Sequence, residues 1–96
     1  MNKTIINSKK NLVEPVESLG RWIGETPLYP LHSFSSEKVK IYAKLEWQQL
    51  GGSVKTRPAY NMIKQGILSG DLAAHHTILD ATSGNTGIAL ATIAAH

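Results

Sequence analysis

The sequence TILDATSGNTGIALA, residues 77–91, is the most informative stretch of this 96-residue chain. It opens with a short apolar run typical of a strand, which predicts a strand over residues 77–82. A polar turn containing two glycines follows at residues 82–87, and the apolar run 88–95 then predicts a helix. The stretch therefore predicts a strand joined to a helix through a glycine-containing turn.

The preceding residues predict another strand and another helix. Apolar and polar residues alternate from Val39 to Trp47, which predicts a strand with one buried face. After a loop at Gly51 and Gly52, Pro58 suits the first turn of a helix that ends near Gly70. The apolar stripe expected on this helix comprises Ala59, Met62, Ile63 and Ile67. The order strand, helix, strand, helix predicts an α/β fold with a parallel sheet and flanking helices.

The two ends of the chain differ in character. Residues 1–20 show no clear hydrophobic period, so they are expected to form an N-terminal arm. The last predicted helix is apolar nearly all round, as helices inside larger proteins are. We therefore expect residues 21–96 to be the N-terminal portion of a larger domain, incomplete in this chain and truncated inside a helix.

Composition excludes several classes of function. The chain is 42% hydrophobic and 18% charged, and it has no cysteine, which rules out disulfides and thiolate sites. Its net charge of +3 comes from scattered lysines and arginines, so no nucleic-acid partner is expected. The four histidines form no metal-like cluster. Neither a signal peptide nor an apolar run of about 18 residues is present, so we expect no membrane association and a cytoplasmic location.

Two clusters of residues could carry chemistry. In the first, GGSVKTRP at residues 51–58, Lys55 follows a glycine pair and stands just before a proline-started helix. A lysine in such a place is usually a solvated surface residue, and the cluster does not fit the phosphate-binding pattern GxxxxGK[ST]. By itself it disfavours nucleotide hydrolysis and indicates nothing more.

The second cluster is the polar turn at residues 82–87. Helix N-termini carry unpaired N–H groups and partial positive charge, so a carboxylate or phosphate could bind there. The hydroxyls of Thr82, Ser83 and Thr86 and the amide of Asn85 would add further donors. The alternative is that Ser83 or Thr86 merely caps the helix. Turn chemistry alone leaves both possibilities open.

Taken together, three motifs resemble one enzyme family. They are IGETPL (residues 23–28), KLE followed by GGSVKTRPA (44–59) and TSGNTGIALA (82–91). In this order they are similar to the fold type II, or β-family, of pyridoxal-phosphate enzymes, whose architecture is that of the tryptophan synthase β chain. The resemblance is to its cysteine synthase and cystathionine β-synthase branch, and three ordered matches are far more specific than each one alone.

The resemblance implies a role for each matching residue. Lys55 would form the Schiff base with pyridoxal 5′-phosphate, and Asn85 would bond the ring hydroxyl of this cofactor. The substrate's α-carboxylate would be held by Thr82, Ser83, Asn85 and Thr86. No metal is implied. The glycine-rich cradle for the cofactor phosphate and the partner of the pyridine nitrogen come later than residue 96 in the family, so the 96 residues alone are expected to be inactive.

The activity implied is β-replacement on an O-activated serine. O-acetylserine or O-phosphoserine would react with sulfide to give L-cysteine, and the full-length enzyme would be a homodimer. The chain departs from the family pattern at Gln49-Leu50, usually Asn-Pro, at Thr56, usually Asp, and at Ala81, usually Pro. The alternatives are a cystathionine β-synthase-like enzyme, a serine/threonine dehydratase, which usually carries SFK in place of Ser-Val-Lys, and an inactive relic that only binds anions.

Overall fold

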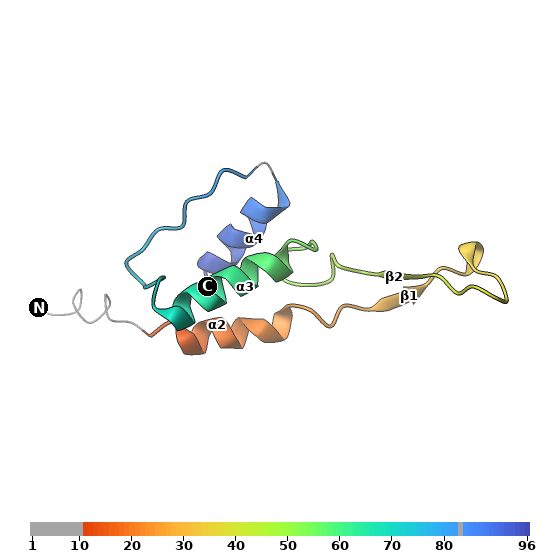
Figure 1. Ribbon diagram of the computed structural model, residues 1–96, viewed down its shortest axis with the longest axis horizontal. Coiled ribbons are helices and arrows are strands. Elements are labelled where there is room, and N and C mark those ends of the chain that lie inside the picture. Colours follow the sequence, from red (N-terminus) through yellow and green to blue (C-terminus); the bar gives the residue numbers. More distant parts are fainter. Residues whose placement is uncertain (1–10, 83) are drawn as a thin grey trace, which may run out of the picture.

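The computed structural model describes residues 11–82 and 84–96, which form three helices, two short 3-10 turns and a small sheet. Figure 1 shows the helices gathered at one end and the sheet projecting away from them, in a molecule 69 Å long and 20 Å thick. The elements in chain order are α2 (Val13–Leu19), η1 (Gly20–Trp22), β1 (Leu28–Pro30), η2 (His32–Phe34), β2 (Tyr42–Lys44), α3 (Thr56–Ser69) and α4 (Asn85–Ala94).

Helix α3 forms where local sequence signals predict it. Pro58 lies in its first turn, where the missing N–H costs no hydrogen bond. Gly70 ends the helix in the left-handed conformation, with φ of 87° and its N–H bonded to the Ile67 carbonyl. The predicted apolar stripe is correct at Ala59 and Ile63, which are buried, but wrong at Met62, which is exposed.

The core lies between α3 and α4. Ala59 and Ala89 are both 0% exposed, and one turn further along each helix Ile63 and Ile93 are also buried. Alanine in the first turns lets the two backbones approach closely, and the isoleucines supply most of the apolar area one turn on. The packing of α3 against α4 therefore rests on the same pattern in both helices, an alanine followed four residues later by an isoleucine. Helix α4 forms as predicted from its apolar run.

Helix α2 has no counterpart in the sequence-based prediction for residues 1–20. Val16 packs into the core beside α3, and its carbonyl accepts a hydrogen bond from the Tyr60 hydroxyl at 2.8 Å. Both contacts come from α3, so this short helix is stabilised by tertiary packing rather than by its own sequence. Within the region predicted as an arm, residues 1–10 lie outside the described part of the chain.

The prediction of a parallel sheet is wrong for the described residues. The sheet has two antiparallel strands, with Leu28 opposite Lys44 and Pro30 opposite Tyr42. The strand predicted from Val39 to Trp47 shrinks to Tyr42–Lys44, and residues 77–82 form no strand.

Lack of cover explains the short strand. The alternating pattern predicts a strand only if a second layer buries its apolar face. Here Val39 and Trp47 are 58% and 63% exposed, so no such layer covers them. Among the residues that the structure describes, no strand lies beside residues 77–82 to share hydrogen bonds with them. The mixed α/β content remains as predicted. Among the described residues, no helix combines the length and hydropathy that a bilayer crossing would require.

Candidate functional site

Lys55 stands at the start of α3 with its side chain exposed. It is the residue that precedes the first helical turn, and its carbonyl accepts the Ala59 N–H at 3.2 Å. Its own N–H donates to the Ser53 hydroxyl at 3.2 Å. Within residues 11–82 and 84–96, no hydrogen bond or ion pair involves the Lys55 ammonium group. The helix therefore fixes the backbone of Lys55 and leaves its amine accessible.

The glycine pair before Lys55 is required by the shape of the loop. Gly51 and Gly52 have φ of 86° and 73°, the left-handed region that favours glycine. A Cβ on Gly51 would also come closer than 3.0 Å to Thr56 Oγ1. This hydroxyl is completely buried and has no hydrogen-bond partner in the described part of the chain. The residue beside Lys55 thus holds an unsatisfied polar atom against the glycine loop.

The polar turn wraps around the beginning of α4. The Thr82 hydroxyl accepts the Gly87 N–H at 3.0 Å and lies 3.4 Å from the Gly84 nitrogen. Capping of the helix therefore comes from Thr82, a residue for which the sequence analysis considered only ligand binding. Thr86 makes no such bond in the structure, and Ser83 lies outside the described residues. The spacing of Thr82 five residues before Gly87 is the signal that could have predicted this contact.

The two halves of the candidate site lie at the same end of the helix pair. Helices α3 and α4 pack against each other, and Figure 1 shows their first turns pointing toward the same side of the molecule. Lys55 precedes α3 and Asn85 begins α4, so both residues belong to this end. In the described ranges no hydrogen bond joins Lys55 to Thr82, Asn85 or Thr86, and the side chains of Asn85 and Thr82 are exposed.

An ion pair that the sequence analysis missed flanks Lys55. Arg57 donates from Nε to Glu46 Oε2 at 2.5 Å and from Nη2 to Oε1 at 3.0 Å, a two-pronged pair. The Thr26 hydroxyl donates to the same carboxylate. The Arg57 guanidinium, with the Thr26 hydroxyl, lowers the pKa of Glu46 to about 2, and the carboxylate in turn raises the pKa of Arg57. Glu46 is therefore ionised at neutral pH.

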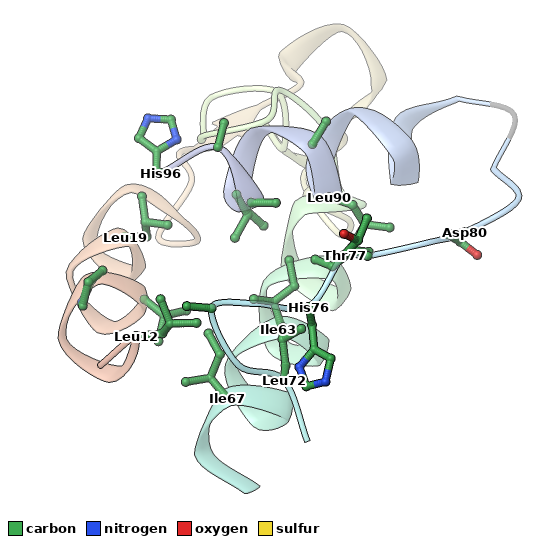
Figure 2. Close-up of a pocket in the computed structure, with 18 of the residues that line it drawn as sticks. Leu12, Leu19, Ile63, Ile67, Leu72, His76, Thr77, Asp80, Leu90 and His96 are labelled. Carbon is green, nitrogen blue, oxygen red and sulfur yellow. The ribbon is translucent and has the colours of Figure 1, made fainter. Parts of the chain in front are cut away.

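One cavity lies apart from Lys55, which is not among the residues that line it. It measures about 910 Å³ and lies among α2, α3, α4 and the segment that follows α3 (Figure 2). Its walls are mainly apolar and include Leu12 just before α2, Ile63 on α3 and Leu90 on α4. It meets the candidate site only at Thr82 and Gly87. No group of three potential metal ligands occurs in the described part of the chain.

Comparison with known proteins identifies one family. A family model described as pyridoxal-phosphate dependent enzyme matches residues 19–96, which include all three sequence motifs. No solved structure matches the chain significantly.

Proposed function

Because this chain belongs to the family of pyridoxal-phosphate dependent enzymes, we propose that the full-length protein catalyses β-replacement on an O-activated serine. Lys55 would bind the cofactor, and the polar turn at residues 82–87 would bind the amino-acid substrate. The observation that carries the proposal is the accessible amine of Lys55 at the end of the helix pair where α4 also begins.

The residues present fit pyridoxal phosphate. When bound, this cofactor supplies an aldehyde that reacts with a primary amine and a ring that withdraws electrons from the substrate. Lys55 offers an exposed amine on a fixed backbone. Asn85 offers an exposed amide that can donate to the ring hydroxyl. The hydroxyl of Thr56, buried beside Lys55, has no hydrogen-bond partner within the part of the chain that the structure describes.

The substrate's carboxylate suits the beginning of α4. A helix N-terminus presents N–H groups and a partial positive charge of about +0.5, both of which favour an anion. The Thr82 hydroxyl holds the turn in shape through Gly87, while Asn85 and Thr86 lie in the first helical turn. We assign carboxylate binding to these three residues together with Ser83.

Lys55 would also move the proton of the reaction. An amine held near the substrate's α-carbon can remove the α-proton as a general base. Carboxylate binding at the polar turn would aim the Cα–H bond toward Lys55, and such orientation accounts for several kcal/mol of barrier reduction in enzymes. Breakage of the bond between the β-carbon and its oxygen would release acetate or phosphate, and addition of sulfide to the β-carbon with return of a proton to the α-carbon would then give L-cysteine.

The residues around Lys55 favour replacement over deamination. The sequence Ser53-Val54-Lys55 and the residues Arg57-Pro58-Ala59 have the form found in the cysteine synthase branch. The second candidate is a serine/threonine dehydratase, which shares the lysine and the asparagine-containing turn. A cystathionine β-synthase-like enzyme would use the same residues with a thiol in place of sulfide.

Product analysis tests the proposal. The full-length protein, loaded with pyridoxal phosphate, would be incubated with O-acetylserine or O-phosphoserine and with sulfide, homocysteine or neither. Sulfide-dependent cysteine is the expected product. A parallel incubation with serine or threonine alone tests the second candidate, because a 2-oxo acid formed from either would identify the dehydratase. Absence of both products with every donor would contradict the proposal, as would full activity in Lys55→Ala.

A further inference from the structure

The side chain of Gln49 joins Gly24, which is distant in sequence, to Glu46 and Ser53 on either side of Gln49 itself. Its Oε1 accepts the Gly24 N–H at 2.8 Å, and its Nε2 donates to the Ser53 carbonyl at 2.9 Å and to the Glu46 carbonyl at 3.0 Å. The Glu46 carboxylate lies 3.4 Å from the same nitrogen. The amide of Gln49 thus uses its acceptor and both N–H groups, a complete set for this half-buried side chain.

These contacts reach Lys55 from both sides. Ser53, two residues before Lys55, is held by Gln49 and accepts the Lys55 N–H on its hydroxyl. Arg57, two residues after Lys55, is held by Glu46. Gln49 also contacts Glu46, so the hydrogen bond to Ser53 and the ion pair to Arg57 belong to one cluster.

The loop between these ties needs external support. Gly51 and Gly52 both have positive φ, and glycine loses more conformational freedom on folding than any other residue. Two backbone hydrogen bonds also hold the loop: the Leu50 N–H donates to the Trp22 carbonyl at 2.9 Å, and the Gly52 N–H donates to the Gln49 carbonyl at 2.9 Å. Without the side-chain hydrogen bonds of Gln49, the backbone from Leu50 to Lys55 would lose its connection to Gly24 and the support at Ser53.

We propose that Gln49 is a positioning residue for Lys55, which holds the glycine loop so that the amine presents one geometry to the cofactor. This inference rests on the proposed role of Lys55. Functional groups must be held within about 0.5 Å of their productive positions, a precision that side-chain packing and outer hydrogen bonds provide. Gln49 supplies such bonds to the segments on either side of Lys55.

The test compares two adjacent glutamines in the full-length protein. Gln49→Ala removes all the side-chain bonds described above. Gln48→Ala is the matched control, because Gln48 is exposed and makes no side-chain hydrogen bond in the described part of the chain. Two readouts are measured: amide hydrogen exchange of the peptide covering residues 50–57 without cofactor, and the rate at which pyridoxal phosphate and borohydride label Lys55.

Gln49→Ala should speed exchange of this peptide and slow labelling of Lys55, each by at least about fivefold, since one lost hydrogen bond is worth about that factor and this variant loses three. Gln48→Ala should change neither. If Gln49→Ala fails to fold, Gln49→Glu serves instead, because it keeps the size and the acceptor but loses both donors; it should show the same two changes. Gln49→Asn keeps the amide on a side chain one methylene shorter, so its labelling rate should lie between those of Gln49→Ala and the wild-type protein.

The outcomes separate this inference from the proposed function. Equal exchange and labelling in the Gln49 and Gln48 variants would overturn the positioning role, even with Lys55 fully labelled. Wild-type protein that is never labelled at Lys55 would overturn the proposed function itself. In that case hydrogen exchange, which needs no cofactor, would still decide whether Gln49 holds the loop.

Discussion

Replacement of Gly87 by alanine should damage the polar turn but leave the stability of the protein almost unchanged. A Cβ at Gly87 would come closer than 3.0 Å to the Cγ2 methyl of Thr82, yet stay 3.5 Å from its Cβ and Oγ1. The serious overlap is therefore with one methyl group. Thr82 is exposed and can swing away, which would break the 3.0 Å bond between its hydroxyl and the Gly87 N–H.

Two opposing free-energy changes decide the effect on stability. Loss of the hydrogen bond costs about 1 kcal/mol, whereas alanine in a helix is favoured over glycine by about 1 kcal/mol. The free energy of unfolding should therefore change by less than about 0.5 kcal/mol. The effect on function is larger, because a displacement of about 1 Å in a binding residue can lower the rate by about a hundredfold. Gly87→Ala should thus lose kcat/KM without losing stability.

The assay pairs steady-state kinetics with denaturant unfolding of the full-length protein. Thr82→Ser keeps the hydroxyl but lacks the methyl, so it serves as the control and should behave nearly as wild type. The double variant Thr82→Ser/Gly87→Ala should recover most of the lost kcat/KM, because the remaining contacts at 3.5 Å are ordinary ones. Unchanged kcat/KM in Gly87→Ala, or no recovery in the double variant, would show that contact with the Thr82 methyl does not control the polar turn.

Three further predictions concern stability. Gly51→Ala should destabilise by about 2 kcal/mol and Gly52→Ala by about 1 kcal/mol in denaturant unfolding, because both have positive φ but only Gly51 also meets the Thr56 hydroxyl; equal losses would contradict this. Ala89→Leu should cost about 2 kcal/mol by overfilling the contact with α3, while exposed Ala91→Leu should cost almost nothing. The pKa of Glu46 is lowered from 4.5 to about 2, so its contribution to stability is present above about pH 4.5 and lost as pH falls toward 2. In Glu46→Gln the free energy of unfolding should fall less between pH 4.5 and pH 2 than in the wild-type protein; the same fall in both proteins would argue against the ion pair.

The helices were predictable because their signals are local. Pro58 and Gly70 mark the two ends of α3, and a continuous apolar run marks α4. Helix α2 was not predictable, since its stability depends on the burial of Val16 and on a hydrogen bond from Tyr60, which is far away in sequence. Local pattern alone cannot supply such partners.

The sheet failed as a prediction for the same physical reason. Alternation from Val39 to Trp47 describes what one strand could bury, but not which strand will pair with it or what will cover it. The observed partner, Leu28–Pro30, is antiparallel and leaves much of that face exposed.

The candidate site was partly predictable. Lys55 and the polar turn stand out in sequence, whereas the cluster of Gln49, Glu46 and Arg57 becomes visible only once the fold brings it together. Glu46 and Arg57 belong to the motif at residues 44–59, and Gln49 lies in the gap within it, but the spacing of the three carries no signal of a shared hydrogen-bond network.

Binding of pyridoxal phosphate by Lys55 can be tested by borohydride reduction of the full-length protein with the cofactor, followed by peptide mass spectrometry. We expect the cofactor's mass on the peptide that contains Lys55. This mass should be absent in Lys55→Ala and retained in Lys64→Ala, which changes a lysine within α3. Two results would show that Lys55 does not bind the cofactor: the cofactor's mass on a different lysine of the wild-type protein, or a Lys55→Ala variant that is still modified.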